Sequence, residues 1–198
     1  NLYDDTLYMF KQLGVIDERD IVEFNPEKFV TRGEFLEYLL RMSDITESDI
    51  ASYTEQKFND VNASSPYLRV SGWAYESGII TMNEERNFYP GLPVTRLDAI
   101  VMLMRMAGYE TSAQRAGGYP NGYISEAYRV ELIKSSGKYD ENLNSLRLLE
   151  LLEDAFDINV MKINVGGESI EYSEDKESTF LKEYKKIEKV EGVMTGNT

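Results

Sequence analysis

A repeat with an offset of 64 residues is the feature that most limits the folds open to this chain. Residues 29–42 read FVTRGEFLEYLLRM, and residues 93–106 read PVTRLDAIVMLMRM. At this offset, 10 of the 32 positions in residues 13–44 are identical to their counterparts, where unrelated stretches would share roughly two. The chain is therefore predicted to be a repeat protein, in which each unit buries its apolar face against a neighbour.

The more complete copy, residues 58–110, shows the plan of the unit. Ser65 and Pro66 are typical of a helix start, apolar residues then follow at helical spacing, and Gly78 suits a helix end. A connector rich in proline and glycine follows and predicts a loop. Thr95 then precedes a second helix that is apolar nearly all round and should be buried. The predicted unit is helix, long loop, helix.

Two further copies and a tail complete the chain. Residues 1–46 are a first copy that is incomplete at its start, and residues 115–161 are a degenerate third copy with Asn144-Ser145 in place of Thr-Arg. In the tail, residues 162–198, alternation around Gly166-Gly167 predicts a hairpin, TFLKEYKKI a short helix and KVEGVMTGN a strand. This tail either clasps the helical body or begins another domain.

We therefore predict a mainly α fold of three helix–loop–helix repeats with a small α+β C-terminal tail. Helices beginning at Arg32, at Arg96 and near Ser145 should pack in one central bundle, because their apolar faces are the broadest in the chain.

Composition excludes several classes of function. The net charge is −14, which argues against nucleic acid as a partner because no basic stripe could displace counterions. The chain has no histidine and no cysteine, so imidazole catalysis, thiol nucleophiles, disulfides and His- or Cys-ligated metals are excluded. It has neither a calcium-loop spacing nor a glycine-rich phosphate loop. We predict no catalytic residue, no metal and no cofactor.

The chain also lacks a stretch of about 18 apolar residues, so no membrane span is predicted. It begins at Asn1 without an initiator methionine or a signal peptide. We interpret it as a fragment or a processed form, whose missing start could have carried an export signal.

The motifs together resemble the S-layer homology (SLH) repeat. In the second copy these marks are Asp60-Val61, Gly78-Ile79-Ile80, Phe88-Tyr89-Pro90 and Thr95-Arg96-Leu97-Asp98. The resemblance covers residues 3–161 and implies three repeats in a pseudo-threefold helical bundle. It also implies non-covalent anchoring to an acidic secondary cell-wall polysaccharide, often one bearing pyruvate ketals. The implied setting is extracellular: a larger surface or S-layer protein in the wall of a Gram-positive-type bacterium.

The motif residues have separate physical roles. Thr31 with Glu34, and Thr95 with Asp98, fit a capping box. The arginine of the motif, at position 32 or 96, would add a planar fork of donors to exposed backbone N–H groups at the helix start, which suits a carboxylate. The alternative is an arginine paired with a protein acid of a neighbouring repeat. Recurrence at one register, together with the resemblance, favours the ligand.

Aromatic side chains are the other candidates for sugar contact. Tyr67, Trp73, Tyr119 and Tyr123 could border a saccharide groove, although aromatics at helical spacing more often pack in a core. We predict at most two competent sites, at Arg32 and Arg96, and expect the Arg96 site to be the better one. Its own repeat is complete and supplies further contacts, from Asp60, Tyr67 and Trp73. Arg147 should point from a different side of its helix and contribute little.

Two other classes of function stay open. Degenerate repeats could keep the fold as a structural or protein-interaction module that has lost the sugar. A glycoside hydrolase would need two carboxylates in one cleft, and the sequence places no such pair. The oligomeric state and the exact saccharide stay open as well.

Overall fold

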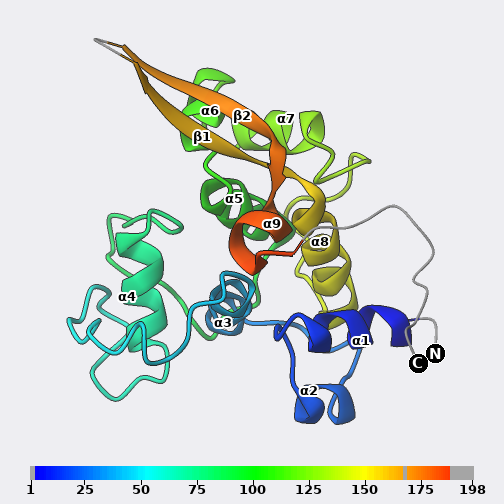
Figure 1. Ribbon diagram of the computed structural model, residues 1–198. Helices are drawn as coiled ribbons and strands as arrows, with labels where there is room; N and C mark the ends of the chain where they lie inside the picture. The colour runs from blue at the N-terminus through cyan, green and yellow to red at the C-terminus, as the bar shows by residue number, and fades with distance from the viewer. Residues whose placement is uncertain (1–2, 167–168, 188–198) are drawn as a thin grey trace.

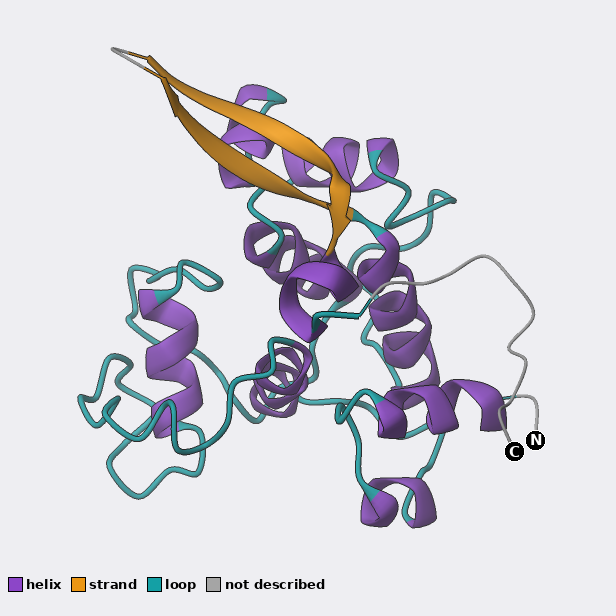
Figure 2. Ribbon diagram, in the orientation of Figure 1, coloured by secondary structure: helices purple, strands orange, loops and turns teal. Residues whose placement is uncertain are grey.

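The computed structural model describes residues 3–166 and 169–187. Nine helices and two strands are assigned in this part of the chain (Figures 1 and 2). Their bounds are α1 Asp4–Gln12, α2 Glu18–Val22, α3 Arg32–Met42, α4 Leu68–Glu76, α5 Arg96–Met106, α6 Glu110–Arg115, α7 Asn121–Arg129, α8 Ser145–Asp157, β1 Asn159–Gly166, β2 Ser169–Thr179 and α9 Phe180–Lys185. The mainly α prediction is confirmed.

The three central helices α3, α5 and α8 start at the predicted register because a side chain caps each one. The Thr31 hydroxyl accepts a hydrogen bond from the Glu34 backbone N–H at 3.1 Å, and the Glu34 carboxylate accepts from the Thr31 N–H at 2.9 Å. In α5, the Thr95 hydroxyl accepts from the Asp98 N–H at 3.1 Å. In α8, the side chain of Asn144 replaces the threonine and accepts from the Arg147 N–H at 2.9 Å. Such caps contribute about 1 kcal/mol each.

The extended residues just before these helices meet in a closed ring of backbone hydrogen bonds. Val94 N–H donates to the Val30 carbonyl at 2.9 Å, Leu143 N–H to the Val94 carbonyl at 2.9 Å, and Val30 N–H to the Leu143 carbonyl at 3.1 Å. The segments that precede α3, α5 and α8 are therefore joined to one another by backbone hydrogen bonds.

Each of the three central helices packs against another helix of the described chain. Helix α4 contacts α3, and α7 contacts α5. Helix α1 lies on α8, where the Phe10 and Phe156 rings are 5.9 Å apart and the Thr6 hydroxyl donates to Glu153 at 3.3 Å. All three central helices contribute to one hydrophobic core. This arrangement excludes separate, non-contacting domains for residues 3–42 and 58–106.

Several local expectations were wrong in detail. Helix α4 begins at Leu68, two residues after Pro66, and the Ser65 hydroxyl accepts from the Tyr67 N–H at 3.2 Å in the preceding turn. The short helix α2 occupies part of the loop predicted for the first copy, and α6 lies in a segment for which no element was predicted. Both run for six residues or fewer, too short to show a clear helical period in the sequence.

The tail begins with the predicted hairpin and short helix. Strands β1 and β2 pair antiparallel from Gly166 with Ser169 inward, and the hairpin starts at Asn159, earlier than expected. Residues 167–168, where part of the turn was predicted, and the predicted strand KVEGVMTGN lie outside the described residues.

Helix α9 fastens the tail to the helical body (Figure 1). Phe180 is fully buried and its ring lies 6.1 Å from the ring of Phe156. The Tyr184 hydroxyl donates to the Met106 carbonyl at 2.7 Å, and Lys185 pairs with Asp44 at 3.3 Å. Of the two roles considered for the tail, these contacts match the clasp. In the described part of the chain, no helix combines the length and the hydrophobicity of a membrane span.

Candidate functional site

Each motif arginine borders a cavity between two repeats. The Arg96 cavity has a volume of about 360 Å³. Its lining residues are Arg96, Leu132, Ile133, Lys134, Ser135, Gly137, Glu141, Leu143, Arg147, Glu150, Leu151 and Asp154. The Arg32 cavity has a volume of about 460 Å³. Its lining residues are Arg32, Ile80, Thr81, Asn83, Asn87, Phe88, Asp98, Val101, Met102, Arg105 and Tyr119.

The backbone at both helix starts is already hydrogen-bonded within the protein. The Arg96 N–H donates to the Glu141 carbonyl at 2.8 Å, and the Arg32 N–H donates to the Leu92 carbonyl at 2.8 Å. The next N–H in each helix also donates to a loop carbonyl of the following repeat. The expectation of exposed N–H groups beside the arginines was therefore wrong. Any anion bound here must be held by side chains.

The Arg96 guanidinium is held by weak, neutral contacts. It lies over the Tyr139 ring, with its central carbon 5.1 Å from the ring centroid, and one nitrogen donates to the Ser135 carbonyl at a long 3.4 Å. Gly137 lies so close beneath the guanidinium that a side chain there would displace it. Among the described residues, no carboxylate forms an ion pair with Arg96. Its charge is therefore open to a ligand.

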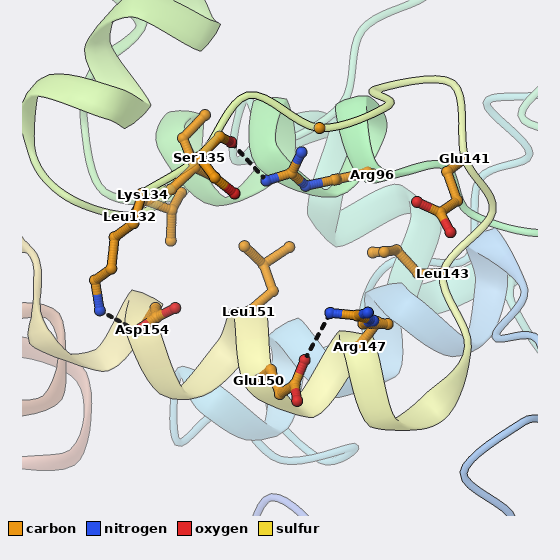
Figure 3. Close-up of a pocket in the computed structure, with 12 residues that line it drawn as sticks. Arg96, Leu132, Lys134, Ser135, Glu141, Leu143, Arg147, Glu150, Leu151 and Asp154 are labelled. Atoms are coloured by element: carbon orange, nitrogen blue, oxygen red, sulfur yellow. Dashed lines mark hydrogen bonds and ion pairs between the residues drawn. The ribbon is translucent and has the colours of Figure 1, made fainter.

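The remaining charges of the Arg96 cavity come from the third repeat (Figure 3). Lys134 pairs with Asp154 at 3.0 Å, and Arg147 pairs with Glu150 at 3.5 Å. The Arg147 and Glu150 side chains are 70% and 54% exposed, and such a pair contributes less than about 1 kcal/mol. It can open at little cost when a ligand arrives.

Arg147 was expected on a different side of its helix from any site, and its position in this cavity corrects that expectation. The cavity lies between the start of α5 and the flank of α8, so a residue one turn into α8 faces Arg96. The error was to place the site at one helix start, whereas two helices of neighbouring repeats form it.

The Arg32 guanidinium is engaged on three sides. Its Nε donates to the Phe88 carbonyl at 2.9 Å, one terminal nitrogen pairs with the Asp98 carboxylate, and its face lies 4.9 Å from the Phe88 ring centroid. The Arg32 side chain is only 19% exposed. Asp98 belongs to the next repeat, so the intramolecular ion pair considered from the sequence describes Arg32. Because Asp98 pairs with Arg32, it does not complete the capping box expected at Thr95.

The other sequence-predicted residues of the Arg96 site lie elsewhere. Asp60 accepts from the Phe88 and Tyr89 N–H groups at 2.8 and 2.7 Å, which shapes the loop beside Arg32. Tyr67 covers Gly33 at the start of α3, and burial raises the pKa of its phenol. Trp73 is 6% exposed and packs in the core. All three belong to the first half of their repeat, which packs on the preceding repeat and away from Arg96.

Tyr119 and Tyr123, the other two tyrosines predicted to border a saccharide groove, lie in different environments. Tyr119 is 61% exposed and lines the Arg32 cavity. Tyr123 is fully buried and its hydroxyl donates to Glu110, so it packs in the core. Sequence reasoning missed Ser135, Gly137 and Tyr139 around Arg96. The sequence could have identified them only by comparing copies, because they lie in the loop of the third copy that corresponds to the Phe88 loop of the second copy.

No described group of three or more acidic side chains is arranged to hold a metal ion. The chemistry available at the Arg96 cavity is a guanidinium without an acidic partner, a rim of opposite charges and the apolar side chains of Leu143 and Leu151. The Tyr139 ring supports the guanidinium and does not line the cavity. This combination suits a ligand with a carboxylate and an apolar face.

Known proteins resemble this chain over two ranges. A middle cell wall protein of Brevibacillus brevis is 23% identical over 184 residues, covering 93% of this chain and 17% of the relative. A surface layer protein of Brevibacillus choshinensis is 23% identical over 189 residues, covering 93% and 16%. An endo-1,4-beta-xylanase A of Thermoanaerobacterium saccharolyticum is 28% identical over 92 residues, covering 46% and 8%. The chain thus spans less than a fifth of the length of these relatives.

The family model of the S-layer homology domain matches residues 57–100. This range holds the second copy of the repeat from before Asp60 to within α5, including Thr95 and Arg96. The match agrees with the resemblance seen in the motifs. Residues 57–100 are therefore similar to the S-layer homology domain.

Proposed function

We propose that this chain is a wall-anchoring module that binds an acidic secondary cell-wall polysaccharide in the Arg96 cavity. The observation that carries the proposal is the guanidinium of Arg96, which lies over the Tyr139 ring at a cavity and has no acidic partner among the described residues. Arg96 is half-buried, and an arginine withdrawn from water is ordinarily matched by an acid of the protein. Here a ligand would supply the acid.

The geometry favours a saccharide that carries a carboxylate, such as a pyruvate ketal. A carboxylate accepts two parallel hydrogen bonds from a guanidinium, and the apolar side chains of Leu143 and Leu151 would contact the C–H face of a sugar. The volume of about 360 Å³ lies within the range of small-ligand sites. Lys134 and Arg147, on the other side of the cavity, would neutralise further negative charge of the polymer.

The family match and the relatives support this assignment. The S-layer homology domain and the two Brevibacillus surface proteins indicate a location at the cell surface, associated with the cell wall. The anchored cargo would be the rest of a larger surface protein. The xylanase match covers only 46% of this chain and 8% of that enzyme, so it does not assign a hydrolase activity here. We propose that the module is not an enzyme.

We further propose a pseudo-threefold organisation of the module. The ring of hydrogen bonds between Val30, Val94 and Leu143 would mark the axis, and each first helix would complete the repeat before it. In this view residues 1–46, 58–110 and 115–161 are the three SLH repeats, and residues 162–198 are a tail that clasps the module through α9.

Sedimentation with purified cell-wall sacculi tests the proposal. The unaltered chain should sediment with the wall, and Arg96→Ala should lower its affinity by 10- to 100-fold, since a lost charge-assisted contact costs about 1.5–3 kcal/mol. Arg69→Ala is the matched control, because Arg69 is an exposed arginine of α4 that lines neither cavity.

Unchanged sedimentation of a folded Arg96→Ala variant would refute the Arg96 cavity as the site. Failure of the unaltered chain to bind any wall preparation would instead favour a structural or protein-interaction module.

A further inference from the structure

The two cavities differ at one equivalent position. Counted from the capping residue, the third residue of α5 is Asp98 and the third residue of α8 is Arg147. Asp98 lines the Arg32 cavity, and Arg147 lines the Arg96 cavity. At this position the Arg32 cavity therefore presents a carboxylate that pairs with its motif arginine, and the Arg96 cavity presents a second guanidinium. The acids that line the Arg96 cavity, which are Glu141, Glu150 and Asp154, form no ion pair with Arg96 among the described residues.

The Arg32 cavity is otherwise equipped for a saccharide. It is as large as the Arg96 cavity, and exposed Tyr119 forms part of its wall. Asn83 and Asn87 supply amide groups, and Val101 and Met102 form an apolar surface. Its arginine sits over an aromatic ring, as Arg96 does.

Asp98 already makes the contact that an acidic ligand would make. Its carboxylate pairs with the terminal nitrogen of Arg32, while Nε donates to the Phe88 carbonyl. An incoming carboxylate would have to share one guanidinium with Asp98 or displace it. Two carboxylates that share one site repel each other, so both arrangements disfavour an acidic ligand.

We propose that Asp98 is an internal carboxylate that closes the Arg32 cavity to acidic saccharides. The third residue of the central helix is then the residue that sets specificity. Asp98 closes one cavity, and Arg147 leaves the other open, so the unaltered chain binds one acidic saccharide. This inference rests on the proposed binding of an acidic wall saccharide at Arg96.

Calorimetric titration of Asp98→Asn with a pyruvylated wall disaccharide tests the inference. Asparagine keeps the size of the side chain and removes its charge, and the Thr95 cap uses the backbone N–H of residue 98, which remains. Binding should rise from one to two disaccharides per chain, and the same disaccharide without its ketal should not show this second site. Asp98→Asn combined with Arg32→Ala should return the number to one.

Two controls keep the result interpretable. Asp175→Asn removes a partly exposed acid from an ion pair with Lys162 in the hairpin, away from both cavities, and should leave one site. Asp98→Ser, with thermal unfolding of each variant, covers the case in which Asp98→Asn does not fold.

The outcomes separate the two proposals. A chain that binds one disaccharide through Arg96 and still binds only one after Asp98→Asn overturns the role of Asp98. Two sites in the unaltered chain, one lost on Arg32→Ala, overturn it as well. Binding by Asp98→Asn alone would overturn the Arg96 assignment and keep the role of Asp98. If neither protein binds, both proposals fail.

Discussion

The Arg32 and Arg96 cavities contain the same sequence motif but differ in charge pairing, because Arg32 forms an ion pair and Arg96 forms none among the described residues. Both arginines are the first residue of a capped central helix, and both lie over an aromatic ring of the following repeat. Arg32 is held by Asp98 and by the Phe88 carbonyl, whereas Arg96 has one long hydrogen bond to Ser135. The difference teaches that the arginine alone does not define a site, because the next repeat decides what faces it.

Degeneracy of the third repeat has an unexpected consequence. Loss of the Thr-Arg pair at Asn144-Ser145 removes an arginine from the third helix start. The same divergence places Arg147 where Asp98 stands in the second copy, and among the described residues none of the acids that line the Arg96 cavity forms an ion pair with Arg96. The third copy therefore lacks a motif arginine of its own, and at the position of Asp98 it places no acid that pairs with Arg96.

The largest expected effect is a difference in stability between variants of the two aromatic rings that lie under the motif arginines, Phe88 under Arg32 and Tyr139 under Arg96. Phe88 is 2% exposed and packs 5.6 Å from Phe58, so Phe88→Ala should lower the free energy of unfolding by about 3–5 kcal/mol. Tyr139 is half-buried in a loop, so Tyr139→Ala should cost less than about 1 kcal/mol while weakening saccharide binding. Urea unfolding and titration of both variants check the contrast. Equal losses of stability would mean that the two rings have the same structural role.

An intermediate effect separates the two arginines. Arg32→Ala leaves Asp98 partly buried without its partner and frees the Phe88 carbonyl, so it should lower the free energy of unfolding by about 2 kcal/mol. Arg96→Ala should lower it by less than about 0.5 kcal/mol, because its contacts are weak and it leaves no unpaired acid. Denaturant midpoints measure both. A larger loss of unfolding free energy for Arg96→Ala than for Arg32→Ala would show that Arg96, and not Arg32, stabilises the fold.

The smallest expected effect concerns salt. The chain carries a net charge of −14, so a distant acidic polymer is repelled and added salt weakens this repulsion. The local contact at Arg96 is shielded by the cavity and should weaken little. Between about 50 and about 200 mM NaCl, wall binding should hold or rise slightly. A steep loss over this range would indicate loose polyelectrolyte adhesion and no formed cavity.

Local features were predictable because short-range physics decides them. The starts of the three central helices follow from capping side chains and apolar periodicity, and the two paired strands follow from alternation on either side of a Gly-Gly pair in the sequence. Helix α4 was predicted with an early start, because a proline after a serine is also compatible with the turn that precedes the helix.

The sequence by itself determined that this chain is a helical repeat protein with arginines at two helix starts and without histidine or cysteine chemistry. Only the tertiary structure decided which residues share a cavity with each arginine. Helix α4 packs on α3, so Tyr67 lies against the start of α3 and Trp73 lies in the core. Tyr139 and Arg147, which come from the third copy, lie near Arg96. The physical reason is that the cavities form between repeats, from side chains brought together by packing and not by spacing along the chain.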